Sequence, residues 1–250
     1  MLTVRNITFG KGAPKICIPI MPKCYEDIQK EIEGLQGLPY EVIEWRMDHY
    51  TNILDINEAV KAITLIRKLL QDTVLLSTFR TSKEGGEQSA TNAQYVTLNK
   101  AIIHTHLTDL LDVECFTGDL EVKEIVEYAH QNNVYIVMSN HDFKATPSYD
   151  EIVRRLTLMD QMGADIPKIA LMPQTKKDVL NVLLATDTVA NTIHKPLITM
   201  SMSAKGVVSR LVGESFGSCL TFGAAKVASA PGQINAKDLK VVLDIIHNSL

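Results

Sequence analysis

A single lysine lies in the middle of an apolar segment of this chain. Lys168 is the one charged residue in the run Ile-Pro-Lys-Ile-Ala-Leu-Met over 166–172, which otherwise has the composition of a buried strand. Burial removes the water that stabilises an ammonium ion, so it favours the neutral amine, which is a nucleophile toward carbonyl carbon. The segment therefore indicates a Schiff-base enzyme. It fits equally well a lysine at a strand end whose head group reaches solvent.

Acidic and basic residues close other apolar runs. Glu44 and Arg46 are two residues apart, and because side chains alternate along a strand they share one face while Trp45 takes the other. Asp112 and Glu114 share a face in the same way at the end of a later run. These side chains are expected to project together from the carboxyl ends of neighbouring strands.

Arginine, glutamate and histidine follow two more runs. Arg80 ends the run over 74–80 and leads into a turn in which Glu84 precedes two glycines. His141 follows the run over 134–139, and histidine is the side chain that gains and loses a proton near neutral pH. A histidine near a strand end is more often structural, but its place among these charged groups favours a proton carrier.

The arginines indicate the charge of the ligand. The chain has seven, and Arg46, Arg80 and Arg210 all fall at the expected carboxyl ends of strands or in the loops that follow them. A guanidinium binds a carboxylate through two parallel hydrogen bonds. The three residues therefore predict a substrate that carries a carboxylate.

Two further features have both a structural and a functional interpretation. Met200 and Met202 share a strand face, where methionines usually fill the core but also form apolar walls beside ligands. The small-residue loop from Ser229 to Gln233 is either an ordinary turn or a lid whose polar side chains bond a hydroxylated ligand.

Short β-type runs alternate with amphipathic helical patterns along the chain, which is typical of a parallel sheet covered by helices. Eight such units predict an α/β protein with a closed (β/α)8 TIM barrel, and no linker-like segment divides the single domain expected over residues 1–250. In this fold the reacting groups lie at the carboxyl ends of the strands. The expected strands cover 15–20, 42–47, 74–80, 110–115, 134–139, 166–172, 197–202 and 219–223.

Local signals predict caps and a hairpin. Asp55 is expected to begin a helix in which Glu58 completes a capping box, and another helix is expected over 235–246. The turn-forming residues 10–14 separate residues 2–9 from the first barrel strand. They predict a small N-terminal β-hairpin that closes the bottom of the barrel.

Composition excludes several classes of function. The 250 residues carry a formal net charge of -4 with a pI near 6.0 and no long basic run, which argues against nucleic-acid or anionic-membrane partners. The N-terminus has no signal-peptide pattern and no segment reaches the apolar length of a membrane span, so we expect a cytoplasmic protein. The four cysteines lack metal-ligand spacing and are expected to be free, buried thiols.

These motifs together resemble type I 3-dehydroquinate dehydratase, the Schiff-base enzyme family of the shikimate pathway. The resemblance holds in order and spacing over nearly the full chain. The matching motifs are Glu44-Trp-Arg-Met-Asp48, Phe79-Arg-Thr-Ser-Lys-Glu-Gly-Gly86, Ser139-Asn-His-Asp-Phe143, Lys168, Met200-Ser-Met202, Ser209-Arg-Leu211, Phe216-Gly-Ser218, Thr221-Phe222 and Ser229-Ala-Pro-Gly-Gln-Ile234.

The resemblance implies a lyase that dehydrates 3-dehydroquinate to 3-dehydroshikimate by syn elimination, in aromatic amino acid biosynthesis. It also implies a homodimer that needs no metal and no organic cofactor. Lys168 would form the imine, His141 would move the protons, Glu84 would orient His141, and Arg210 would clamp the carboxylate. Glu44, Arg46, Arg80, Ser229 and Gln233 would hold the ring and its hydroxyls, with apolar walls from Met200, Met202 and Phe222.

Two positions depart from the family pattern. Ser203 stands where family members often carry glycine, which puts the geometry of that loop in doubt. Pro19 stands where a small hydroxyl residue is frequent, and it removes a possible ligand contact.

Two rival functions share part of these residues. A class I aldolase or transaldolase would use the same nucleophile but cleave a carbon–carbon bond, usually in a phosphorylated sugar, and no glycine-rich phosphate cradle is apparent in the last two barrel loops. A noncatalytic barrel that binds a carboxylate would keep the arginines without needing Lys168, His141 and Glu84 together.

Overall fold

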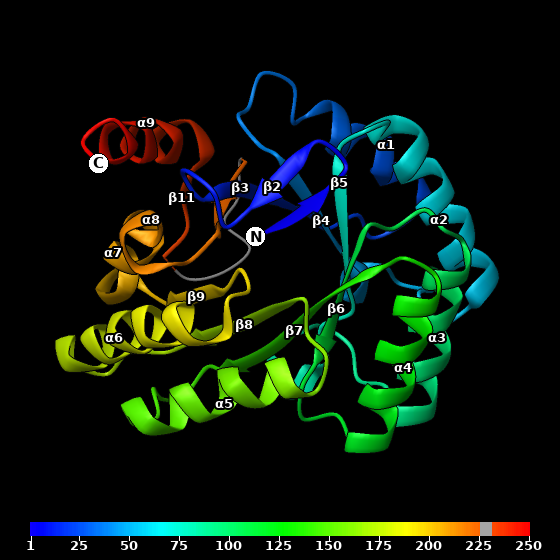
Figure 1. The fold of residues 1–250 in the computed structure, drawn as a ribbon. Coiled ribbons are helices and arrows are strands. Elements are labelled where there is room, and N and C mark those ends of the chain that lie inside the picture. Colours follow the sequence, from blue (N-terminus) through cyan, green and yellow to red (C-terminus); the bar gives the residue numbers. More distant parts are fainter. Residues whose placement is uncertain (226–231) are drawn as a thin grey trace.

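A curled parallel sheet surrounded by helices forms the molecule (Figure 1). The fold comes from a computed structural model that describes residues 1–225 and 232–250. All eight expected barrel strands are present; the first seven pair in parallel in chain order, and the eighth pairs in parallel with the first. They are β3 (Lys15–Ile20), β4 (Val42–Arg46), β5 (Val74–Thr78), β6 (Leu110–Glu114), β7 (Tyr135–Asp142), β8 (Ile166–Leu171), β9 (Ile198–Ser201) and β10 (Leu220–Ala224).

The two edges of this sheet meet. A parallel bridge joins Leu197, just before β9, to Ser218, and the N–H of Cys219 donates to the carbonyl of Leu197 at 2.7 Å. A two-residue strand, β11 (Ile234–Asn235), adds a further parallel pairing outside β10. The predicted TIM barrel is therefore confirmed.

Alternation of side chains along the strands creates two cores. One cluster, which includes Val42, Leu110 and Ile166, fills the interior of the barrel. The other, which includes Trp45 and Ile43, lies between the sheet and the helices. The prediction that Trp45 faces away from its two charged neighbours is correct, and Glu44 and Arg46 are thereby directed to the interior.

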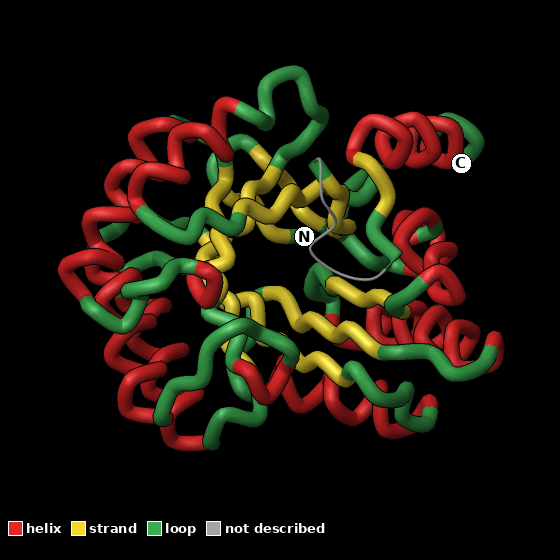
Figure 2. The backbone as a smooth tube through the Cα atoms, turned by 180° about the vertical axis from the view of Figure 1, so that it is seen from behind, coloured by secondary structure: helices red, strands yellow, loops and turns green. Residues whose placement is uncertain are grey.

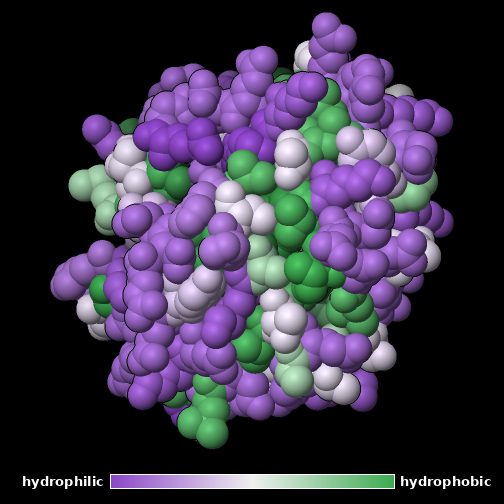
Figure 3. All heavy atoms as spheres, turned by 90° about the vertical axis from the view of Figure 1, so that its right-hand side faces the viewer, coloured by the Kyte–Doolittle hydropathy of each residue, from purple (hydrophilic) through white to green (hydrophobic). Residues whose placement is uncertain are grey.

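Helices surround the sheet, as the view from behind shows (Figure 2). Hydrophilic side chains cover much of the outer surface, with a band of hydrophobic ones on the side drawn in Figure 3. The helices are α1 (Tyr25–Glu33), α2 (Ile56–Leu70), α3 (Asn92–His104), α4 (Asp119–Gln131), α5 (Tyr149–Gln161), α6 (Lys176–Ile193), α7 (Val207–Leu211), α8 (Gly213–Phe216) and α9 (Ala236–His247).

Helix α2 begins as expected, but its cap differs. The Asp55 side chain accepts a hydrogen bond from the N–H of Asn57, so it is the N-cap. The predicted capping box with Glu58 is wrong, because Glu58 instead lies within 3.4 Å of the Tyr50 hydroxyl and 3.7 Å of Lys61.

The N-terminal hairpin exists, but with a different turn from the predicted one. Strands β1 (Leu2–Val4) and β2 (Ile7–Phe9) pair antiparallel with each other, so the chain reverses at Arg5 and Asn6 and not at residues 10–14. Val4 and Phe9 pack into the interior cluster with residues at the starts of the barrel strands. The hairpin thus covers the amino-terminal end of the barrel, as expected.

The four cysteines are free, and Cys17, Cys115 and Cys219 are buried as predicted. The expectation of burial was wrong for Cys24, which is exposed at the N-cap of α1. In the described part of the chain, no helix is both long and apolar enough to span a bilayer.

Candidate active site

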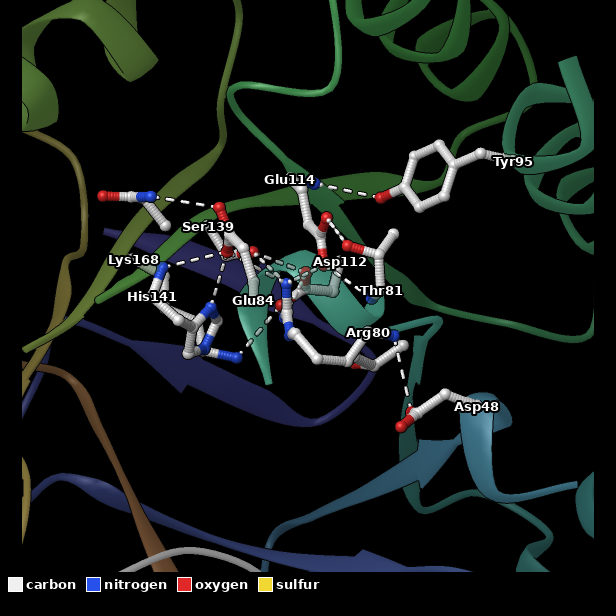
Figure 4. Close-up of polar contacts among 12 residues, drawn as sticks. Asp48, Arg80, Thr81, Glu84, Tyr95, Asp112, Glu114, Ser139, His141 and Lys168 are labelled. Atoms are coloured by element: carbon white, nitrogen blue, oxygen red, sulfur yellow. Dashed lines mark hydrogen bonds and ion pairs between the residues drawn. The ribbon is translucent and has the colours of Figure 1, made fainter. Parts of the chain in front are cut away.

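Charged side chains converge at the carboxyl ends of the strands, inside the barrel mouth (Figure 4). Asp112 of β6 and Ser139 of β7 lie in neighbouring strands, and Ser139 is in register with Lys168 of β8. The inward faces of these three strands therefore each supply a polar group to a shared cluster.

Lys168 is buried, with 3% of its surface exposed, so it does not reach solvent from a strand end. Its surroundings are less apolar than predicted. The amine nitrogen lies 3.0 Å from the Asp112 carboxylate, 3.8 Å from that of Glu44, and 5.0 Å from the centre of the Phe222 ring. Lys168 therefore forms ion pairs with two carboxylates, one from β6 and one from β4.

A network of buried charges surrounds Asp112. Arg80 donates to Asp112 at 2.6 Å and to Glu114 at 2.9 Å, and it also donates to the Ser139 hydroxyl at 3.0 Å. Burial alone would raise the pKa of Asp112, but the charges of Arg80 and Lys168 hold it well below its usual range. Asp112 therefore stays ionised beside Lys168.

Glu84 and His141 form a pair. Glu84 accepts hydrogen bonds from the backbone N–H of His141 at 2.9 Å and contacts ring nitrogen Nδ1 at 3.0 Å. Because Nδ1 faces a carboxylate, the second nitrogen, Nε2, is left to exchange protons with a ligand. Figure 4 shows the side chains of His141 and Lys168 next to each other.

Burial changes the protonation of this pair in opposite directions. It lowers the pKa of His141 well below its ordinary value, helped by the positive charges of Arg80 and Lys168. It raises the pKa of Glu84 to about 7, against the opposing charge of Arg80. The imidazole is therefore neutral near pH 7 and able to accept a proton.

A tight turn places Glu84. Gly85 has φ of 84°, and a Cβ there would lie 2.4 Å from the Phe143 ring, while a Cβ at Gly86 would lie 1.9 Å from the carbonyl oxygen of Arg80. Glu114 anchors the start of the turn, since its carboxylate accepts from the N–H and the hydroxyl of Thr81 at 2.8 and 2.7 Å.

His141 lies within β7, although the sequence predicted a strand that ends at residue 139. The strand continues because β7 pairs with β8 as far as Asp142 and Leu171. His141 is consequently held by the sheet and not by a loop, which fixes the position of its ring more firmly.

Glu44 and Arg46 point into the barrel as predicted, and each has an internal partner. Glu44 accepts from the Thr78 hydroxyl at 2.9 Å. Arg46 donates twice to Asp48, at 2.8 Å for both hydrogen bonds, and keeps 13% of its side chain exposed. Asp48 also accepts from the N–H of Glu87, so it connects two loops of the rim.

The apolar side of the mouth is formed by Met200, Met202 and Phe222, all buried in the interior cluster. Arg210, from α7, is also buried, and its guanidinium lies 3.6 Å from the Met200 sulfur. Burial lowers the pKa of Arg210 to about 10, so it remains charged at neutral pH. Such a buried cation is well suited to an anionic ligand.

Three expectations concern Ser203, Pro19 and the loop after β10. Ser203 has φ of 59°, a left-handed conformation that favours glycine, so this chain keeps the strained backbone with a side chain present. Pro19 lines a cavity of about 780 Å³ at the rim. Ser229 falls outside the described residues, and Gln233 immediately precedes β11.

Some residues of the cluster were missed as site residues. Asp112 carried a signal, because it shares a strand face with Glu114, but nothing in the sequence paired it with Lys168. Asn140 donates to Glu84 at 3.0 Å from the opposite face of β7, which a simple alternation of faces does not predict. Ser139 donates to Asp112 at 2.6 Å.

Comparison of the sequence with known proteins identifies a single family. The type I 3-dehydroquinase family matches residues 16–250. The 3-dehydroquinate dehydratase of Salmonella paratyphi B is 51% identical over 249 residues, which are 99% of this chain and 99% of the relative.

Solved structures give the same result. The type I 3-dehydroquinate dehydratase from Clostridium difficile, with covalent modified comenic acid, has a TM-score of 0.97 at 50% identity and is matched over 100% of this chain and 98% of that one. The 3-dehydroquinate dehydratase from Enterococcus faecalis has a TM-score of 0.91 at 37% identity, over 98% and 99% of the two chains.

Proposed function

The chain belongs to the type I 3-dehydroquinase family, and from that membership we propose that Lys168, His141 and Glu84 carry out its chemistry. The protein is a 3-dehydroquinate dehydratase of the shikimate pathway, and a Schiff-base mechanism is characteristic of the family. The observation that supports Lys168 as the nucleophile is its burial in the barrel mouth, 3.0 Å from Asp112 and close to His141.

The first step is imine formation. Neutral His141 takes a proton from the Lys168 ammonium, and the freed amine attacks the ketone carbon of 3-dehydroquinate. The carbinolamine then loses its hydroxyl as water, to which His141 returns the proton. The resulting protonated imine carries the same single positive charge as the ammonium, so the ion pair with Asp112 is preserved.

The second step is elimination. The protonated imine withdraws electrons and acidifies the neighbouring C–H, whose proton His141 removes. The electron pair then expels the hydroxyl β to the imine carbon, and His141 gives that hydroxyl its proton so that it departs as water. Hydrolysis of the conjugated imine consumes one water, releases 3-dehydroshikimate and restores Lys168. The protein's side chains supply every proton transfer.

The remaining residues hold the substrate. Arg210 binds the substrate carboxylate, because its buried guanidinium can donate two parallel hydrogen bonds to the carboxylate oxygens. Met200, Met202 and Phe222 pack against the ring. Contacts to the hydroxyls and the ring come from Glu44, Arg46, Arg80, Ser229 and Gln233, of which Arg80 acts through the carboxylates it binds, Asp112 and Glu114.

The C. difficile relative was solved with covalent modified comenic acid, and covalent chemistry with an organic acid agrees with this assignment. The direct test is to mix the purified protein with 3-dehydroquinate and follow the ultraviolet absorbance of the conjugated product. Absorbance that rises in proportion to protein concentration is the expected result. No signal at high protein concentration would rule out the dehydratase function.

Arg210→Ala is expected to weaken substrate binding. The variant loses a charge-assisted hydrogen-bonding partner of the carboxylate, so KM should rise roughly 10–100-fold while kcat changes little. Steady-state kinetics measures both constants. Arg154→Ala, an arginine with 58% of its side chain exposed on α5, is the control. A large fall in kcat at unchanged KM would contradict the carboxylate role.

The activity should fall in acid as the Glu84–His141 pair takes up a proton. Burial raises the pKa of Glu84 to about 7, so kcat/KM is expected to fall below about pH 7, where protonated Glu84 no longer stabilises the imidazolium that forms when His141 takes the substrate's proton. In Glu84→Gln only His141 titrates, and since its pKa is lowered by burial, the acid limb should move to lower pH. Glu124→Gln on α4 is the control, and an unmoved limb in Glu84→Gln would contradict the pairing.

We also propose that residues 1–250 fold as a single domain and that the protein is a cytoplasmic homodimer. Exposed apolar side chains on two helices of the outer layer, Leu180 and Leu184 on α6 and Val241 and Ile245 on α9, support an interface with a second copy.

A further inference from the structure

An amide links the active-site pair to the outer helices. Asn140 is 7% exposed, and its side-chain nitrogen donates to Glu84 at 3.0 Å. Its side-chain oxygen accepts a hydrogen bond from Arg155 of α5 at 2.9 Å. Arg155 is in turn held by Glu151, one turn earlier in the helix, at 2.7 Å. A continuous chain of hydrogen bonds therefore runs from the surface of α5 to Glu84.

Arg155 fixes the orientation of this amide whether Glu84 is ionised or protonated. The two ends of an asparagine side chain have nearly the same shape, but only the oxygen accepts and only the nitrogen donates. A guanidinium has donors and no acceptor, so the end that faces Arg155 must be the oxygen. The nitrogen of Asn140 then necessarily faces Glu84.

The consequence for Glu84 is electrostatic. A hydrogen bond donated to a carboxylate favours its charged form. The charged and titratable groups around Glu84 are Arg80 at 3.5 Å, His141, Glu114 and Cys115. Burial and the charge of Glu114 oppose ionisation of Glu84, whereas the charge of Arg80 and the hydrogen bonds from Asn140 and the His141 backbone favour the carboxylate.

We propose that Arg155 is a positioning residue for the reaction: by fixing the amide of Asn140, it keeps Glu84 ionised and able to hold His141. This inference rests on the proposed roles of Glu84 and His141. Arg155 lies outside the barrel mouth, on a surrounding helix with 20% of its side chain exposed, and it acts without touching the substrate.

The neighbouring arginine provides a matched control. Arg154 binds the same Glu151 at 2.7 and 2.9 Å, and in the described part of the chain its hydrogen bonds go to that carboxylate. Arg155→Leu and Arg154→Leu therefore remove the same charge from adjacent positions of α5. Only the first releases the amide of Asn140.

The experiment measures the pH dependence of kcat/KM for both variants. In Arg155→Leu the amide can rotate and present its oxygen to Glu84, so the pKa of Glu84 rises and the acid limb moves to higher pH by on the order of one unit. Arg154→Leu should keep the wild-type profile. Arg155→Lys retains a donor and a charge, so its acid limb should lie between those of Arg155→Leu and the wild type. A profile of Arg155→Leu that superimposes on the wild type would overturn the proposal.

A second variant tests whether Arg155 acts through Asn140. Asn140→Leu removes the donor itself and should shift the limb in the same direction. Adding Arg155→Leu to Asn140→Leu should then produce no further shift, since the link is already broken. An additional shift of similar size would mean that Arg155 acts by another route, and it would overturn the proposal. If the proposed function itself were wrong, the wild type and Arg154→Leu would also lack activity, so their activity distinguishes the two failures.

Discussion

Replacing Lys168 by alanine is expected to abolish turnover. The variant has no amine to form the imine, and without the imine the C–H proton next to the ketone is too weakly acidic for a neutral imidazole. We expect kcat to fall by at least roughly 10⁴-fold, as for other enzymes that lose their nucleophile. The absorbance assay with 3-dehydroquinate measures the loss directly.

Two controls make this result specific. Lys176→Ala removes an exposed lysine at the start of α6 and should leave the rate unchanged. Circular dichroism should show that Lys168→Ala is folded, although the loss of a buried cation leaves Asp112 with Arg80 as its remaining ionic partner. A folded Lys168→Ala protein with a near-normal rate would contradict covalent catalysis at this position.

His141→Ala is expected to bind substrate but to turn it over slowly. General acid–base catalysis by one side chain contributes about 10²–10⁴-fold, and His141 is assigned more than one proton transfer, so the fall in kcat should reach or exceed the upper part of that range. Lys168 and the arginines remain, so binding of 3-dehydroquinate, measured by calorimetry, should change much less than kcat.

In His141→Ala the covalent adduct on Lys168 should accumulate with time. Without the proton carrier both imine formation and elimination slow down, but the imine has no efficient way to break down, so the covalent adduct should accumulate on Lys168. His104→Ala, at the exposed end of α3, is the matched control. A His141→Ala enzyme that retains more than about a tenth of the wild-type kcat would contradict its assignment as the general base.

The sequence predicted the barrel and the inward direction of most site residues because both follow from local periodicity. Lys168 stands out in an apolar run, and Glu44 and Arg46 share a face whatever lies around them. The end of β7 could not be predicted in this way. Its extension to Asp142 depends on pairing with β8, a partner separated from it by helix α5.

The partners of the site residues were also beyond prediction from sequence. Lys168 was expected in an apolar pocket, yet Asp112 lies 3.0 Å away, brought there from β6 by the curvature of the barrel. Arg80 was expected to meet substrate, and the sequence did not predict its hydrogen bonds to Asp112 and Glu114. Such contacts depend on strand order and register, which no single segment of the chain determines.

Burial of this charged cluster affects both the stability of the protein and the protonation states of the site residues. Removing charged groups from water is unfavourable, and a buried network is rarely a net source of stability. Here it keeps Asp112 ionised, His141 neutral and Glu84 near its point of titration. We infer that these protonation states, more than stability, are what the buried charges provide.

The most direct test of the account is to trap the imine. Borohydride added during turnover of 3-dehydroquinate should reduce the imine to a stable amine, and mass spectrometry of the digested protein should place the added mass on the peptide that contains Lys168. Trapping should also inactivate the enzyme in proportion to the modified fraction. If that peptide keeps its original mass while substrate is being consumed and borohydride is active, catalysis does not proceed through this lysine.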